Sequence, residues 1–184
     1  MKKNFVFAAI LSLFVCVSAV SAQDKSAKAA NFSGTWTLDV SKSKLGDRNM
    51  IESQSLAVVH TEKDIKITPT TKRMAPADGG GGGRKGGGMG GGDVTTTYTL
   101  DGKETTVEMD SPRGKVPVKF TGKSDGAKLW LGSSRTMNTQ AGEMTMTSKE
   151  TWWLSADGNT LTIDGESTSP RGTNSTQKVF TKKL

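Results

Sequence analysis

The sequence predicts an all-β domain whose strand spacing is that of an antiparallel barrel or sandwich, and together with the resemblance described below we expect an up-and-down barrel of about eight to ten strands. Short runs in which apolar and polar residues alternate follow one another along the chain, which is the pattern of half-buried strands. Asp-Gly and Ser-Pro-Arg-Gly turns separate many of these runs. Threonine, which favours strands, is frequent. The low hydrophobic content of 33% therefore indicates a thin core rather than a disordered chain.

The beginning of the chain predicts export. Two lysines precede an apolar run over residues 5–17, and small residues follow before Gln23. This is the layout of a cleavable signal peptide over residues 1–22, and the run is too short to span a bilayer comfortably. We therefore expect a periplasmic or secreted protein. A lipoprotein anchored through Cys16 is a minor alternative, because bulky residues precede that cysteine.

The remainder of the chain is expected to form one domain over residues 31–184, after a short polar leader at residues 23–30. Ten strands are expected in it, at residues 32–40, 53–61, 64–70, 94–100, 105–110, 115–121, 127–133, 143–154, 160–166 and 175–182. One short helical turn is possible within residues 41–52.

A glycine-rich segment at residues 78–93 interrupts this series. Such a segment behaves as a flexible coil, so we expect a long loop between two strands. It does not resemble a phosphate-binding loop, because no Gly-Lys-Ser/Thr motif and no helix follow. A solvated linker is the favoured interpretation, and a lid over the barrel mouth carrying Arg84 and Lys85 is the alternative.

The composition argues against most catalytic and metal chemistry. His60 is the only histidine, and Cys16, the only cysteine, would leave with the signal. No zinc site, calcium loop or catalytic triad is recognisable. The formal charge of +7 is spread along the chain without a basic cluster among aromatic residues, so nucleic-acid binding is not expected. We expect no enzyme activity, no cofactor and no metal.

Apolar strand faces rich in aromatic residues and methionine point to an interior that holds a ligand. Methionine adapts its shape to an irregular cavity, and tryptophan adds one polar group. Trp130 alternates with leucines, so one of these two sets faces outward unless the strand is buried on both sides. Plain core packing is the competing interpretation for every such residue. The candidate ligand contacts are Tyr98, Trp130, Met144, Met146 and Trp152.

The stretch FSGTWTLDVSKSKLG, residues 32–46, resembles the first-strand motif of lipocalin-like barrels, with Gly34 and Trp36 as the matching residues. The resemblance implies that the tryptophan closes the base of the barrel. It also implies that a basic side chain of the last strand packs over this ring. Lys178 or Lys182 is available for that role, and Lys178 is assigned to the base. The chain looks most like exported bacterial lipocalin-like proteins.

The expected function is therefore the non-enzymatic binding of a small, largely apolar molecule in the barrel interior. The alternative is a structural or interaction protein of the cell envelope, whose barrel is filled by its own side chains and whose loops bind a partner.

Overall fold

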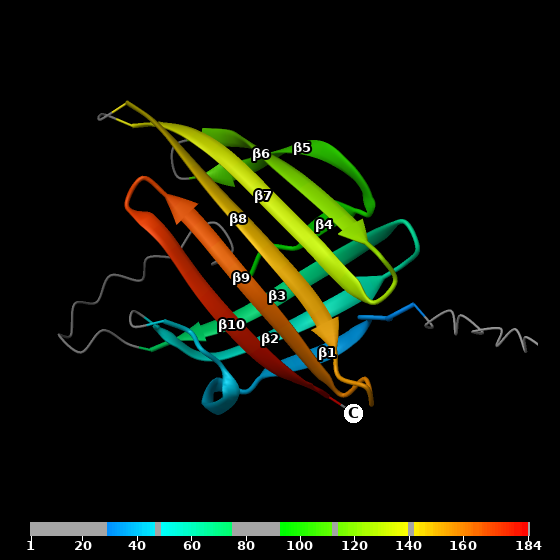
Figure 1. Cartoon of the computed structure of the whole chain (residues 1–184). Coiled ribbons are helices and arrows are strands. Elements are labelled where there is room, and N and C mark those ends of the chain that lie inside the picture. The colour runs from blue at the N-terminus through cyan, green and yellow to red at the C-terminus, as the bar shows by residue number, and fades with distance from the viewer. Residues whose placement is uncertain (1–28, 47–48, 75–92, 112–113, 140–141, 184) are drawn as a thin grey trace, which may run out of the picture.

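The protein is an antiparallel barrel that is nearly closed (Figure 1). The structure, a computed structural model, describes residues 29–46, 49–74, 93–111, 114–139 and 142–183. The predicted signal segment 1–22, most of the leader and all of the glycine-rich loop 78–93 except Asp93 lie outside the described residues.

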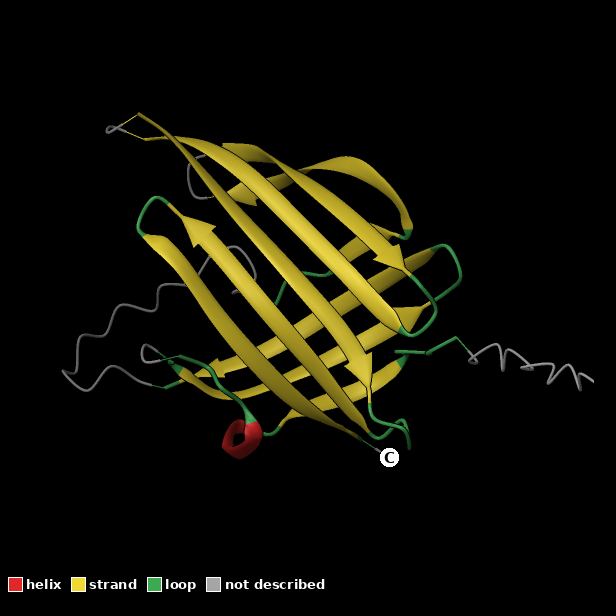
Figure 2. Ribbon diagram, viewed as in Figure 1, coloured by secondary structure: helices red, strands yellow, loops and turns green. Residues whose placement is uncertain are grey.

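Ten strands and one short helix form the described part of the chain (Figure 2). They are β1 (Gly34–Leu38), the 3-10 helix η1 (Val40–Lys42), β2 (Ile51–His60), β3 (Asp64–Arg73), β4 (Thr96–Thr99), β5 (Asp101–Ser111), β6 (Gly114–Ser124), β7 (Lys128–Thr139), β8 (Gly142–Leu154), β9 (Thr160–Ser169) and β10 (Gly172–Lys182). All ten predicted strands are confirmed, with bounds that differ by up to six residues.

The strands follow the sheet order β4-β3-β2-β1-β10-β9-β8-β7-β6-β5. Every strand pairs with its neighbour in sequence except β4 with β5, and the first and last strands pair with each other. In Figure 1 the strands β7 to β10 cross in front of β1 to β3, and the gap lies between β4 and β5. The predicted up-and-down barrel is thus confirmed.

Turn residues place the β6–β7 and β8–β9 hairpins where the sequence predicted them, whereas the turn expected at Asp101-Gly102 lies within β5. Between β6 and β7, the Asp125 carboxylate accepts backbone hydrogen bonds from Ala127 and Lys128 at 2.9 and 2.7 Å. These bonds hold the pKa of Asp125 below its ordinary value. Gly126 takes a φ of 88°, which L-residues rarely adopt. The Asp-Gly sequence therefore fixes this turn.

The base of the barrel is built around Trp36, whose side chain is fully buried. Its indole nitrogen donates to the Phe32 carbonyl oxygen at 2.9 Å, so the polar group is satisfied. Lys182 Nζ lies 5.3 Å from the ring centroid, within cation–π range. Gly34 has a φ of 137°, and a Cβ there would lie 3.0 Å from Lys182 Cε. Glycine is therefore required beside the tryptophan.

The structure corrects which basic residue packs over the Trp36 ring. The assignment of Lys178 was wrong, because Trp36 pairs with Lys182 in the β1–β10 ladder, and Lys178 lies four residues away. Lys178 instead lines the barrel interior.

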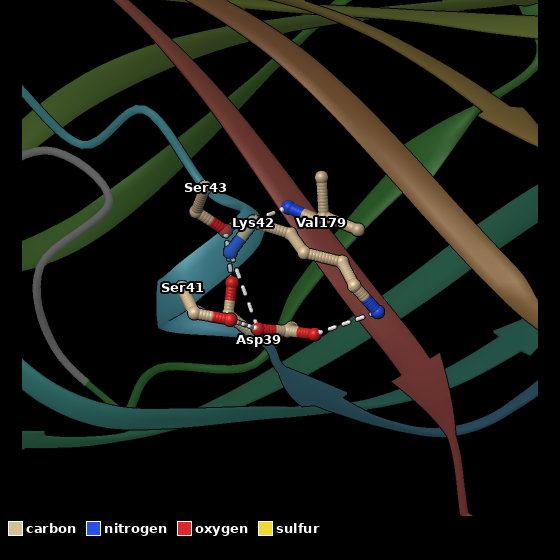
Figure 3. A network of polar contacts seen from close by, with 5 residues as sticks. All are labelled: Asp39, Ser41, Lys42, Ser43 and Val179. Atoms are coloured by element: carbon tan, nitrogen blue, oxygen red, sulfur yellow. Dashed lines mark hydrogen bonds and ion pairs between the residues drawn. The ribbon is translucent and has the colours of Figure 1, made fainter.

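A small polar corner joins β1 to β10 beside the base (Figure 3). The Asp39 carboxylate accepts hydrogen bonds from the Ser41 hydroxyl at 2.6 Å and from the Lys42 backbone at 3.2 Å. These bonds, with Ser41 the larger influence, hold the pKa of Asp39 below its ordinary value. Ser43 Oγ accepts from the Val179 backbone at 2.9 Å. The segment after Leu38 therefore turns the chain and ties it to the last strand.

Candidate ligand-binding cavity

The barrel interior contains a cavity of about 200 Å³. Many of the buried core residues pack next to this cavity and do not line it. Of the largest fully buried side chains, Trp152 and Phe180 also line the cavity, whereas Trp36 and Phe32 do not. The core thus closes one part of the barrel and leaves the cavity on the side of the β4–β5 gap, where Val94, Met109 and Val116 complete its wall.

Alternation along the strands decides which side chains face the cavity. On β7 and β8 the inward pairs run from Leu129 with Trp152, through Leu131 with Glu150 and Ser133 with Ser148, to Arg135 with Met146. The wall therefore changes from apolar near the base to polar farther along both strands.

Aromatic side chains form a large part of the apolar wall. Tyr98 of β4 meets Phe120 of β6 edge to face, with ring centroids 5.2 Å apart. Trp152 donates its indole N–H to Glu150 Oε2 at 2.8 Å, so this carboxylate has a partner inside the barrel. Burial, followed by the charge of Glu150, raises the pKa of Tyr98 far above its ordinary value. Tyr98 therefore stays protonated at neutral pH.

Two further polar groups enter the cavity wall from opposite directions. Gln54 of β2 is 5% exposed, and its amide nitrogen donates to Thr71 Oγ1 at 2.9 Å. Arg135 of β7 reaches Met146 Sδ with Nη2 at 3.6 Å. Burial lowers the pKa of Arg135, which remains a strong base. The cavity wall thus combines an apolar surface with a few polar groups, the composition typical of small-molecule sites.

Similar proteins are found among solved structures. No family model matches the chain, and no curated protein matches it either. The chain is similar to a zebrafish ileal bile acid-binding protein complexed with cholic acid, at 17% identity and a TM-score of 0.46 over 83% of this chain and 98% of that one. It is also similar to a fatty-acid-binding protein from Manduca sexta, at 13% identity and a TM-score of 0.41 over 81% and 97%.

The structure separates the predicted ligand contacts into three groups. Tyr98 and Trp152 line the cavity. Met144 and Met146 share the inward face of β8 but lie farther along the strand and do not line the cavity. Trp130 lies on the outer face and is 37% exposed, because Leu129 and Leu131 take the inward positions. The placement of Trp130 in the interior was therefore wrong.

Several polar cavity residues were missed in the sequence, among them Gln54, Arg135 and Lys178. Arg135 lies beyond the predicted end of its strand at residue 133, whereas β7 continues to Thr139. Alternation through Leu129, Leu131, Ser133 and Arg135 was the available signal. Gln54 and Lys178 lie in predicted strands, and Gln54 alternates with Leu56 and Val58 toward the interior.

His60 has a structural role at the end of β2. Its ring meets Phe32 edge to face at 5.5 Å, and Nδ1 accepts the Phe32 backbone N–H at 3.4 Å. Ser33 Oγ bonds the His60 backbone rather than its imidazole.

Within the described ranges, no three His, Cys, Asp or Glu side chains gather as metal ligands. Among the same residues, no helix is long and apolar enough to cross a membrane.

Proposed function

We propose that this protein binds a small, largely apolar molecule inside its barrel, without catalysing a reaction. The observation that carries the proposal is the cavity between the core and the β4–β5 gap, with its aromatic and aliphatic wall. A barrel filled by its own side chains, the competing interpretation, would leave no such space. Tyr98, whose hydroxyl is protonated at neutral pH, acts as a hydrogen-bond donor toward an occupant rather than as a base.

The cavity volume limits the size of the occupant. A cavity of about 150 Å³ lined by apolar groups binds benzene, and drug-sized molecules occupy about 300–1,000 Å³. At about 200 Å³, the cavity suits a compact molecule with a single ring or a short branched chain. A longer molecule would have to extend toward the β4–β5 gap.

A cavity-filling variant tests the proposal. Native mass spectrometry of the protein purified from the cells that make it is expected to show a retained small molecule. Ser133→Phe places a ring in the cavity and is expected to abolish retention, whereas Ser134→Phe, one residue along and facing outward, is the matched control. Urea unfolding of both variants checks that each remains folded, because overpacking typically costs about 1–3 kcal/mol. Equal retention by both variants would contradict binding in this cavity.

We further propose that the protein is exported and acts after removal of residues 1–22. The support is the three-part layout of that segment in the sequence. The intact mass of the purified protein is the test. A chain that begins at Gln23 supports export, and a chain that retains Met1–Ala22 contradicts it.

A further inference from the structure

Gln54 brings a hydrogen-bond acceptor without a partner to the cavity wall. Its side chain is 5% exposed, and its amide nitrogen is engaged by Thr71 Oγ1. Its oxygen, Oε1, is buried and has no hydrogen-bond partner. A buried polar atom left unsatisfied costs about 1–3 kcal/mol, so native proteins rarely tolerate one without a reason. Since Gln54 lines the cavity, an occupant that donates a hydrogen bond would satisfy it.

Arg135 brings a hydrogen-bond donor without a partner to the same cavity. Its Nε is buried and unpaired, and its Nη2 has only the Met146 thioether, a weak acceptor. Its two cross-strand neighbours are Val118 and Met146, which carry no charge. In the part of the chain that the structure describes, no carboxylate forms an ion pair with Arg135. The guanidinium is therefore a partly buried cation without a counter-charge.

The other charged groups of the cavity do not supply that counter-charge. Glu150 lies four residues from Met146 along β8, which corresponds to roughly 13 Å of strand, and it already accepts from Trp152. Asp110 lies directly opposite Lys115 in the β5–β6 ladder. Lys178 is a second cation in the wall. An acidic group of an occupant, placed beside Arg135, would thus contact a cation. It would also lie far from the Glu150 carboxylate.

We infer that the natural occupant is a compact carboxylic acid with an apolar body and a hydroxyl group, the carboxylate bound by Arg135 and the hydroxyl donated to Gln54. This inference rests on the proposed function, because it names the class of molecule that the cavity binds. The body is an aromatic ring, to match the Tyr98, Phe120 and Trp152 side chains of the wall.

Four probes with the same ring separate the two polar contacts. Hydroxyphenylpropanoate carries both groups, phenylpropanoate the acid alone, propylphenol the hydroxyl alone, and propylbenzene neither. Titration of the full-length mature protein at pH 7 by calorimetry is expected to rank hydroxyphenylpropanoate first. Loss of the acid is expected to weaken binding about ten- to hundredfold, and loss of the hydroxyl about three- to tenfold.

Two substitutions assign each preference to its residue. Arg135→Met is expected to remove the preference for the acid while keeping the preference for the hydroxyl. Gln54→Leu is expected to do the reverse. Lys123→Met, which removes one exposed cation from the outer face of β6, is the matched control and leaves both preferences unchanged.

The outcomes distinguish this inference from the function on which it rests. If the wild-type protein binds all four probes with similar affinity, the cavity binds apolar molecules but the inference is wrong. The inference is also wrong if both substitutions leave the ranking of the four probes unchanged. If none of the probes binds, the proposed function fails and the inference falls with it.

Discussion

The tryptophans show how the same residue type takes different roles in one barrel. Trp36 is fully buried at the base, with its N–H bonded to Phe32 and Lys182 over its ring. Trp130 lies on the outer face of β7. The position of Trp36 could be predicted from its Gly-x-Trp context. The orientation of Trp130 could not, because a strand with leucine on one side and tryptophan on the other offers two apolar faces.

This difference predicts unequal costs for the same substitution. Trp36→Ala is expected to lower the free energy of unfolding by about 3–5 kcal/mol, because it removes a buried aromatic side chain and leaves a cavity. Trp130→Ala is expected to cost less than about 1 kcal/mol. Urea unfolding of both variants measures the difference, and equal losses would contradict the assignment of Trp36 to the base.

His60 makes stability depend on pH. Burial lowers the pKa of His60 below its ordinary value of 6.5, an effect that outweighs the opposing charge of Asp64. The unfolded chain then binds the proton more readily than the folded chain, so stability is complete above 6.5 and falls as the pH decreases below it. Protonation also removes the acceptor that Nδ1 offers to the Phe32 N–H.

We expect the free energy of unfolding to decrease between about pH 7 and 5. His60→Asn is expected to flatten this dependence, since the chain has no other histidine. The carboxylates of Asp39, Asp125 and Asp157, whose pKa values are lowered, contribute to stability that is lost only at more acidic pH. Urea titrations at several pH values measure the slope. An unchanged slope in the variant would assign it to other groups.

At the scale of the element, strands β4 and β6 approach each other closely where the barrel lacks a ladder. Tyr98 packs on Phe120, and Gly122 of β6 lies beneath the turn after β4. A Cβ on Gly122 would lie 2.5 Å from the Thr99 carbonyl oxygen and 3.1 Å from the Tyr98 Cβ. Backbone therefore meets backbone at this point, and glycine permits it.

Gly122→Ala is expected to destabilise the barrel by about 1–3 kcal/mol, because the turn after β4 has to move away. Gly165→Ala is the control in another strand. Its Cβ would meet only the Thr176 hydroxyl, at 3.0 Å, and this flexible side chain can shift. Thermal unfolding compares the two variants. Equal destabilisation would show that the contact with Thr99 does not hold the barrel closed.

Strand positions were predictable because the alternation and the Asp-Gly and Ser-Pro-Arg-Gly turns are local signals. The ends of the strands were less predictable from the sequence. β7 and β8 extend along each other up to the pair Thr139 and Gly142, through a polar run that separates Leu131 from Met137 in β7. Ladder hydrogen bonds continue a strand through such a run, and they leave no trace in hydropathy. Arg135 was missed for this reason.

At the scale of the whole molecule, the barrel is held unequally around its circumference. β1 pairs on both sides, with β2 and β10, whereas β4 pairs only with β3. The strand β5 is exposed along most of its length. The sheet therefore continues across the join of the first and last strands, and within the described residues the ladder is missing between β4 and β5.

Amide exchange is expected to follow this asymmetry. Amides of β1 and β10 within their shared ladder should exchange only through global unfolding, while those of β4 and β5 that face the gap should exchange through local opening. Hydrogen–deuterium exchange with mass spectrometry resolves the two classes. Protection of β4 equal to that of β1 would contradict a gap between β4 and β5. An occupant of the cavity is expected to slow exchange in β4.

The barrel as a whole could be predicted from strand number and spacing, together with the Gly-x-Trp stretch. The cavity could not, because its volume depends on how side chains from many strands share the interior. The pairing of Trp36 with Lys182 rather than Lys178 likewise depends on register, which a single sequence does not display.

The strand order carries one consequence for protein engineering. Read from β5 to β10 and then from β1 to β4, the sequence order becomes the spatial order, and every junction joins neighbours in the sheet. The first and last strands already lie side by side, since Lys183 donates a backbone hydrogen bond to the Thr35 carbonyl oxygen at 2.8 Å. A circular permutant cut at Leu100, with a short linker joining its original ends, is expected to fold into the same barrel with every ladder intact. Its new ends would lie at the gap, beside the β2–β3 turn, where the Leu100 backbone donates to the Lys63 carbonyl oxygen at 2.8 Å.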